Sequence, residues 1–304
     1  MEGKRASEER TPAICDYEGS NYQESFWDQG QRDYEDRVEA IALKRLLPGS
    51  GKRMLELGAG AGRNTPRYGG YSDIVLLDYS RTQLARAQAA LGDVRRYRYV
   101  AADVYRLPFA QGVFDGATMI RTLHHMAEPI KALKQVRAAM AQAGIFILEY
   151  ANKRNIKSIL RWLIRRQDWN PFELDPIEFV ELNFDFHPAA VRTWLAEAGF
   201  KLERELTVSH FRQEWLKRTV PTSILVGADS LAQWTGDLWQ LSPSVFTRSR
   251  AVGEPGLSSG AFWKCPACQS TLMEEVAEGV HCQTCDLLWP KVEGIYDFKI
   301  HLRD

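Results

Sequence analysis

Four cysteines near the C-terminal end of the chain have the spacing of a metal site. They form two Cys-x-x-Cys pairs separated by thirteen residues, namely Cys265, Cys268, Cys282 and Cys285. Four thiolates complete a tetrahedral Zn²⁺ shell with no open position, so such a site is structural rather than catalytic. The pattern therefore predicts a structural Zn²⁺ site, with redox disulfides as the alternative. We expect His281 to be a neighbour of this site and not a ligand.

A glycine-rich turn in the first third of the chain has the character of a cofactor site. Residues 55–63 read Leu-Glu-Leu-Gly-Ala-Gly-Ala-Gly-Arg after an apolar run. Glycines let the chain turn tightly and let a ligand lie against the backbone, and the amides of the following helix can hold ligand oxygens. A dinucleotide fingerprint would need glycine at position 63, where this chain has Arg63. The turn therefore predicts a cofactor other than a dinucleotide.

Strands and helices that alternate along the chain must position this turn. Apolar runs predict strands at 53–57, 73–78, 97–101, 114–120 and 144–150, and helical patterns cover 34–47, 80–91 and 128–141. Continuous apolar strands that alternate with helices indicate a parallel sheet covered on both faces. Further strands are expected at 200–208 and 245–252, with a tryptophan-containing helical insertion at about 209–243 between them.

The turn and four later features resemble the class I S-adenosylmethionine-dependent methyltransferases of the type 11-like group, over roughly residues 22–252. The later features are Asp78, Asp103-Val104, the pair of segments 107–109 and 114–115, and the Arg-Thr-Leu-His-His run at 121–125. The resemblance implies an α/β fold with a Rossmann-like, seven-stranded sheet, mostly parallel with an antiparallel last strand. It also implies S-adenosylmethionine as cofactor. The alternative is a generic nucleotide-binding sheet with tight turns.

The resemblance assigns cofactor-binding roles to residues at the matching positions. Gly58 and Gly60 would contact the methionine part, Asp78 the ribose hydroxyls, and Asp103 the adenine. An N-terminal aromatic side chain would pack near the sulfonium by cation–π attraction. The full expected set is Glu56, Gly58, Gly60, Asp78, Tyr79, Asp103, Val104, Arg121 and Tyr22.

His124 and His125 are candidate general bases for this chemistry. They follow a predicted strand at its carboxyl end, where ligands bind in open α/β sheets, and imidazole accepts a proton near neutral pH. The alternative is that the two histidines form a structural turn.

The C-terminal cysteine segment has its own resemblance. Its Cys-Pro-x-Cys and Cys-x-x-Cys pairs, followed by Trp289-Pro290 and Gly294-Ile295, resemble the small zinc-ribbon methyltransferase-activator family. That family implies a tRNA, rRNA or protein substrate, with the ribbon as a built-in activator. Residues 253–304 hold four basic and eight acidic residues, which suits packing on a basic partner, in cis or across a homodimer.

The segment 155–166 predicts a basic amphipathic helix. Ile156, Ile159, Leu160, Leu163 and Ile164 recur at helical spacing among lysines and arginines, with no acid before Asp168. Such a helix can contact an anionic membrane surface or RNA phosphates. The alternative is a helix that packs on its own core with a solvated basic face.

Composition limits the remaining choices. The 304 residues are 45% hydrophobic with 39 basic and 39 acidic residues, which argues against disorder and against a body-wide nucleic-acid surface. We expect a cytoplasmic protein, because no signal-like or membrane-spanning apolar run is present. The expected domains are a methyltransferase domain at 1–252 with an N-terminal cap at 1–50, a linker at 253–261 and a zinc ribbon at 262–304.

Together these features predict methyl transfer from S-adenosylmethionine to an unidentified acceptor. A small molecule or lipid-like metabolite is favoured over RNA or protein. A non-catalytic cofactor-binding protein is the hypothesis from another class.

Overall fold

The computed structural model describes residues 12–16, 18–19, 32–92, 94–253 and 260–302. Tyr22 and about half of the predicted N-terminal cap lie outside these described residues. The first described helix is α1 (Asp33–Leu46), close to its predicted position at 34–47.

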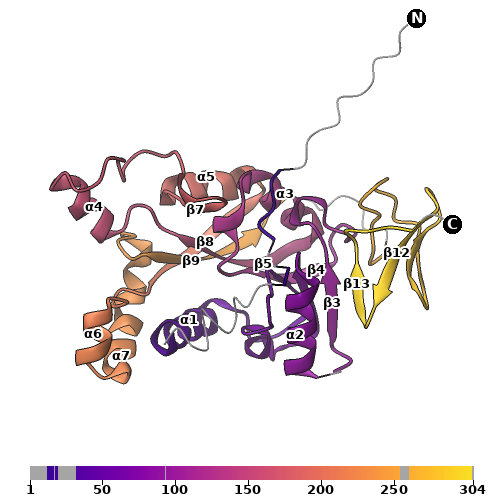
Figure 1. Ribbon diagram of the computed structural model, residues 1–304, viewed down its shortest axis with the longest axis horizontal. Coiled ribbons are helices and arrows are strands. Elements are labelled where there is room, and N and C mark those ends of the chain that lie inside the picture. The colour runs from indigo at the N-terminus through magenta and orange to yellow at the C-terminus, as the bar shows by residue number, and fades with distance from the viewer. Residues whose placement is uncertain (1–11, 17, 20–31, 93, 254–259, 303–304) are drawn as a thin grey trace, which may run out of the picture.

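The centre of the molecule is a sheet in which seven strands follow the order β3-β2-β1-β4-β5-β9-β8 (Figure 1). Strands β1 to β5 pair in parallel, and β9 runs antiparallel to both of its neighbours. The strands are β1 (Gly51–Leu57), β2 (Tyr71–Asp78), β3 (Tyr97–Ala101), β4 (Phe114–Met119), β5 (Met140–Ala151), β8 (Phe200–Val208) and β9 (Ser244–Ala251). This arrangement is the mostly parallel Rossmann-like sheet expected from the sequence.

Helices cover both faces of this sheet because its strands are apolar on both sides. On one face, Leu55, Leu57 and Val75 belong to a core that includes helix residues of α3 and α5. On the other, Met54 and Ile74 pack with α2, and α1 and α7 cover strands β5, β8 and β9. The helices are α2 (Arg81–Leu91), α3 (Pro129–Ala139), α4 (Ile156–Leu163), α5 (Pro188–Glu197), α6 (Glu214–Thr219) and α7 (Thr222–Ala232). No helix in the described ranges has the length and apolar character needed to cross a bilayer.

The cysteine segment extends the same sheet. The sequence predicted a separate zinc ribbon at 262–304 and gave no sign of this pairing. Strands β10 (Met273–Val276), β11 (Gly279–Cys282), β12 (Leu287–Val292) and β13 (Ile295–Asp297) pair in succession, and β13 pairs in parallel with β3. The result is one eleven-stranded sheet instead of a seven-stranded sheet beside a separate unit. The free edge of β3 offers unpaired backbone groups, and β13 satisfies them.

The cysteine segment at 260–302, called the ribbon below, also packs through side chains on the rest of the molecule, called the body. Trp263 stacks on Phe109 with ring centroids 5.8 Å apart. Arg98 lies 4.5 Å above the Phe262 ring. Asp297 pairs with Arg81 at 3.7 Å. The acidic ribbon therefore meets basic residues in cis.

The segment after β5 contains a helix and a hairpin. The hairpin consists of β6 (Ile177–Val180) and β7 (Asn183–Asp185). The helix predicted at 155–166 is present as α4, but the alternative that it packs its apolar face on the core is wrong. Ile156, Leu160, Leu163 and Ile164 are all exposed, whereas Ser158 is buried and Ile159 and Trp162 are half-buried on the inner side of the helix.

Candidate active site

The glycine-rich turn follows β1 and adopts a conformation that suits glycine. Gly58 and Gly60 have φ values of 67° and 53°, in the left-handed region. A Cβ atom at Gly58 would lie 2.0 Å from the Thr122 hydroxyl oxygen, whereas no atom lies within 4 Å of a Cβ built at Gly60. The turn therefore packs closely on one side and leaves open space on the other.

That open space is a pocket at the carboxyl ends of the parallel strands. Six of the predicted cofactor residues and one predicted base line it, namely Gly58, Gly60, Asp78, Tyr79, Val104, Arg121 and His125. Glu56, Asp103 and His124 are close in sequence to these residues but are absent from the pocket wall. Carboxyl ends of strands are where open α/β sheets bind ligands.

Asp78 ends β2 and connects two backbone segments of the pocket. Its carboxylate accepts hydrogen bonds from the Gly60 amide at 2.8 Å and the Ser80 amide at 2.9 Å. Burial raises the pKa of Asp78 although these amides and Lys299 favour its ionised form. A carboxylate oxygen accepts more than one hydrogen bond, so Asp78 retains acceptor capacity for a ligand hydroxyl.

Asp103 caps the short helix that follows β3. Its carboxylate accepts from the Tyr105 amide at 2.8 Å, and burial raises its pKa. Val104, the next residue, lines the pocket. Of the predicted adenine-binding pair, Val104 therefore lines the pocket, and Asp103 is a helix cap outside the pocket wall.

Glu56 lies beneath the turn and is 4% exposed. It accepts from the Thr65 hydroxyl at 2.6 Å and the Tyr68 hydroxyl at 3.4 Å. Burial raises its pKa to about 7, although both hydroxyls stabilise its charged form. In this position Glu56 connects the strand below the turn to Thr65 and Tyr68.

Arg121 is held at the pocket by carboxylates from two elements. Its Nε donates to Glu39 of α1 at 2.8 Å, and its backbone amide donates to Glu149 of β5 at 2.8 Å. Burial alone would raise the pKa of Glu39, but Arg121 and Arg63 lower it. The φ of Arg121 is 54°, an uncommon value for a residue with a side chain. This position is therefore determined by tertiary contacts.

Of the two predicted bases, the structure places His125 in the pocket. Its Nδ1 lies 2.9 Å from the Leu182 carbonyl oxygen. A carbonyl only accepts, so Nδ1 carries the proton and Nε2 is the acceptor nitrogen of the neutral ring. Burial lowers the pKa of both histidines, and the Leu182 contact opposes this shift in His125. Neutral imidazole is the form that accepts a proton.

A segment near the N-terminus lies over the pocket. Ile14 forms a β-bridge with Met126, and Ile14 and Cys15 both line the pocket. Cys15, which is distant in sequence from the other four cysteines, therefore belongs to the pocket wall. The predicted role of Tyr22 falls on residues outside the described part.

A second cavity of about 930 Å³ adjoins the pocket and shares Arg121 with it. Its wall includes His210, whose Nδ1 lies 3.0 Å from the carboxylate of fully buried Asp229. Tyr34 donates to the same carboxylate at 2.7 Å. A histidine oriented by a buried acid is a common proton-accepting arrangement. Sequence reasoning missed it, because the two residues are nineteen positions apart within the insertion.

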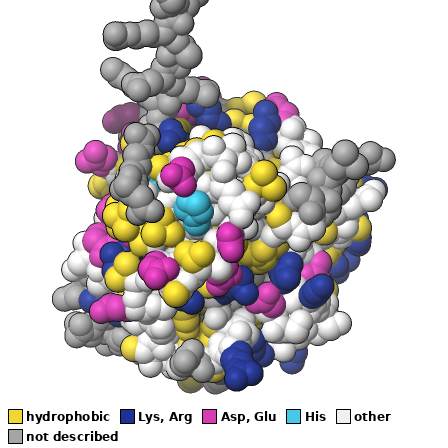
Figure 2. Space-filling view, turned by 90° about the vertical axis from the view of Figure 1, so that its right-hand side faces the viewer, with side chains coloured by type: hydrophobic (Ala, Val, Ile, Leu, Met, Phe, Trp, Pro, Cys, Tyr) yellow, Lys and Arg dark blue, Asp and Glu magenta, His cyan; other side chains and the backbone are white. Residues whose placement is uncertain are grey.

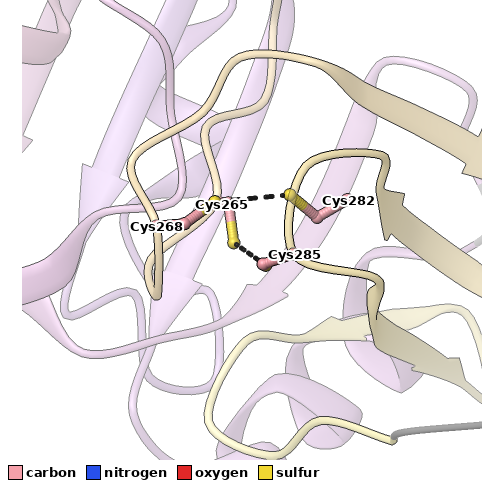
Figure 3. Close-up of side chains that lie close together, drawn as sticks. All are labelled: Cys265, Cys268, Cys282 and Cys285. Atoms are coloured by element: carbon pink, nitrogen blue, oxygen red, sulfur yellow. Dashed lines mark hydrogen bonds between the residues drawn. The ribbon is translucent and has the colours of Figure 1, made fainter.

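The four cysteines converge as their spacing predicts (Figure 3). The Sγ atoms of Cys265 and Cys285 are 3.7 Å apart, and those of Cys268 and Cys282 are 3.5 Å apart. These distances exceed a disulfide bond of about 2.05 Å. They approach the edge of about 3.8 Å that a tetrahedron with Zn–S bonds of about 2.3 Å requires. The donor set therefore fits Zn²⁺, and His281 bonds Asp286 instead.

Comparison with known proteins agrees with this geometry. Residues 55–148 match the family model described as a methyltransferase domain. An O-methyltransferase, cnsE, of Penicillium expansum is 27% identical over 46% of this chain and 55% of its own. A demethylmenaquinone methyltransferase of Clavibacter sepedonicus is 29% identical over 38% of this chain and 49% of its own. The chain thus spans about half the length of these curated relatives.

Solved structures share the fold. A chain of the complex between the Haloferax volcanii Trm112 methyltransferase activator and a methyltransferase superposes with a TM-score of 0.55 and 16% identity, over 76% of this chain and 96% of that one. An S-adenosylmethionine-dependent methyltransferase from Listeria monocytogenes gives 0.52 and 15% identity, over 72% and 99%. Residues 55–148 therefore match a methyltransferase domain, and the chain shares the fold of S-adenosylmethionine-dependent methyltransferases of known structure.

Proposed function

We propose that this chain transfers a methyl group from S-adenosylmethionine to a small-molecule or lipid-like acceptor. The observation that carries the proposal is the pocket formed by the Gly58–Gly60 turn and Asp78, which shares Arg121 with a second, larger cavity. Two adjoining spaces suit a reaction between two bound molecules. Demethylmenaquinone methyltransferases among the relatives support a lipid-like acceptor.

The cofactor supplies a methyl group that is already activated as part of a sulfonium. The protein then has to align donor and acceptor and exclude water. The exposed backbone at Gly60 and the carboxylate of Asp78 would hold the cofactor, and Arg121 stands between the two spaces. Where the acceptor carries a proton, Nε2 of His125 would receive it from the cofactor side, or His210 from the second cavity.

Calorimetry with S-adenosylhomocysteine tests the cofactor site. The Asp78→Ala variant should bind at least about tenfold more weakly, since it loses a charged acceptor worth about 1.5–3 kcal/mol. Asp73→Ala on the same strand is the matched control, because Asp73 pairs with Arg53 away from the pocket. Absence of binding to the unaltered protein, or equal affinity of both variants, would contradict the proposal.

A radiolabelled methyl-transfer assay on separated lipid, metabolite, RNA and protein fractions identifies the acceptor class. Label in the RNA or protein fraction would favour a second candidate, in which the ribbon is a built-in activator of an RNA or protein methyltransferase. The pairing of β13 with β3 in cis, and the likeness to a chain from an activator complex, favour that candidate. Cofactor binding without label in any fraction would favour a non-catalytic role.

The Zn²⁺ proposed for the cysteine cluster has a structural role in either case. Four thiolates leave no open coordination position for a substrate. A homodimer through the ribbon is a further prediction.

Figure 2 shows the side of the molecule on which the ribbon lies. Charged side chains of both signs are interspersed on this face.

A further inference from the structure

Helix α4 exposes the side chains that an amphipathic helix normally buries. Ile156, Leu160, Leu163 and Ile164 are between 53% and 61% exposed, although they recur at i, i+4, i+7 and i+8. In a globular protein such a stripe faces the core. In Figure 1, α4 lies at the end of the molecule opposite the zinc ribbon.

The polar residues of α4 hold it to the body instead. Asn155 caps the helix by accepting from the Ser158 amide at 3.0 Å, and its own amide group donates to the Asn152 carbonyl at 2.8 Å. The Ile156 amide donates to the Leu241 carbonyl at 2.9 Å. Asn155 and Ser158 are both buried. The inner side of α4 is therefore occupied by Asn155, Ser158 and the half-buried Ile159 and Trp162, and the other four apolar side chains face outward.

Basic side chains flank the exposed stripe. Lys157, Arg161, Arg165 and Arg166 are exposed, and none of them forms an ion pair with any described residue. The helix contains no acid. The following segment carries several exposed acids, at positions 173, 175, 178 and 181. The basic character is therefore confined to α4 and its C-terminal end.

We propose that α4 lies on an anionic lipid surface, with its apolar stripe in the headgroup boundary and its basic side chains on anionic headgroups. An apolar face flanked by lysine and arginine is the physical pattern of interfacial helices. The stripe is aliphatic, whereas single-stranded RNA is bound by stacking on aromatic rings. A second copy of this chain docked through α4 about a two-fold axis would bring like charges together.

The same helix lines the second cavity. Ile156, Lys157 and Arg161 belong to its wall, together with Trp169 and Phe179. An acceptor held in the bilayer would therefore meet the cavity where α4 contacts the surface. The entry of an acceptor from the bilayer into this cavity rests on the proposed methyl transfer, whereas the contact of α4 with lipid does not.

Flotation with vesicles tests the lipid contact on the full-length protein. Vesicles of phosphatidylcholine mixed with phosphatidylglycerol should carry the protein up the gradient, and vesicles of phosphatidylcholine alone should carry less. A Leu160→Asn/Leu163→Asn double variant should bind the mixed vesicles about tenfold more weakly. An Arg165→Gln/Arg166→Gln variant should lose most of the dependence on anionic lipid and on salt.

Leu272→Asn is the matched control, because Leu272 is 63% exposed on the ribbon. It should bind vesicles like the unaltered protein. All variants should keep their melting temperature and their affinity for S-adenosylhomocysteine, so that failure of the lipid contact is separable from failure of the cofactor site.

Three results would overturn the proposal. The first is absence of flotation of the unaltered protein with the mixed vesicles, and the second is full binding by the leucine double variant. The third is a change of oligomeric state, or a loss of tRNA binding in fluorescence anisotropy, caused by the same α4 substitutions without an effect on vesicles.

Discussion

Two glycines two residues apart in the cofactor turn have different reasons to be glycine. Both have positive φ, but only Gly58 faces packed atoms, with Thr122 filling the space where a Cβ would stand. At Gly60 the same space is the pocket. Packing therefore requires glycine at position 58, and access of a ligand to the backbone favours glycine at position 60. The sequence motif alone does not distinguish these two reasons.

We expect Gly58→Ala to lower the free energy of unfolding by about 2–4 kcal/mol, from backbone strain and overpacking together. Gly60→Ala should cost only about 1 kcal/mol, because strain acts alone there. Both variants should bind S-adenosylhomocysteine more weakly. Urea denaturation and calorimetry measure the two effects. Equal stability losses would contradict the packing argument for Gly58.

Glu56 makes stability depend on pH. Its pKa is about 7 in the folded protein, against 4.5 for an ordinary glutamate, because the folded state buries it. The folded state therefore retains a proton that the unfolded state releases between these values. Its contribution to the free energy of unfolding is full below the lower value and is lost as pH rises through about 7.

A Glu56→Gln variant should remove this dependence while keeping an acceptor oxygen for Thr65. We expect the melting temperature of the unaltered protein to fall more than that of the variant between about pH 5 and pH 8. Differential scanning calorimetry at a series of pH values measures it. Parallel curves for the two proteins would show that Glu56 is ionised without cost in the folded state.

Among the elements, strand β13 joins the ribbon to the central sheet through a single pairing with the edge strand β3. Its partner β3 is the last strand of the seven-stranded part of the sheet, and β13 covers that edge although it lies about two hundred positions later in the chain. The adjacent bridge between Phe109 and Trp263 strengthens the junction. The ribbon is thus part of the sheet that carries the cofactor turn.

Replacing Trp263 by alanine should destabilise this junction. Trp263 is 4% exposed and stacks on Phe109, so its loss should lower the free energy of unfolding by about 3–5 kcal/mol. Trp215→Ala is the control, because Trp215 is 65% exposed on α6, and it should change stability by less than about 0.5 kcal/mol. Similar losses in both variants, measured by chemical denaturation, would mean that the junction adds no stability.

At the scale of the whole molecule, the segment after β13 connects the unit that holds the proposed zinc site to the cofactor pocket. Phe298 follows β13 and donates its amide to the Ala101 carbonyl at the end of β3. Lys299 then places its ammonium 4.6 Å from the centre of the Tyr79 ring, which lines the pocket. The ribbon therefore reaches the rim of the cofactor site.

Removal of the metal should consequently affect both stability and cofactor binding. Treatment with a strong chelator, or a Cys282→Ser substitution, should lower the melting temperature and weaken S-adenosylhomocysteine binding several-fold. The chelated protein should recover both properties on addition of Zn²⁺ but not of Mg²⁺. Unchanged cofactor affinity after metal loss would show that the ribbon stabilises itself without supporting the pocket.

Local patterns in the sequence determined most of the secondary structure, the cofactor turn and the cysteine cluster. These features depend on residues close together in the chain, such as Gly58 and Gly60 or each Cys-x-x-Cys pair, whose spacing alone restricts their geometry. Apolar runs likewise placed the seven central strands within a few residues of their observed bounds.

Only the tertiary structure decided which surfaces meet. The joining of β13 to β3, the meeting of His210 and Asp229, and the outward face of α4 all depend on contacts between segments distant in the chain or on the orientation of a whole element. A hydrophobic stripe in the sequence predicts that one face of a helix is apolar, but it does not predict which surface covers that face. For α4, the polar anchors Asn155 and Ser158 took the inner side, and the stripe was left outside.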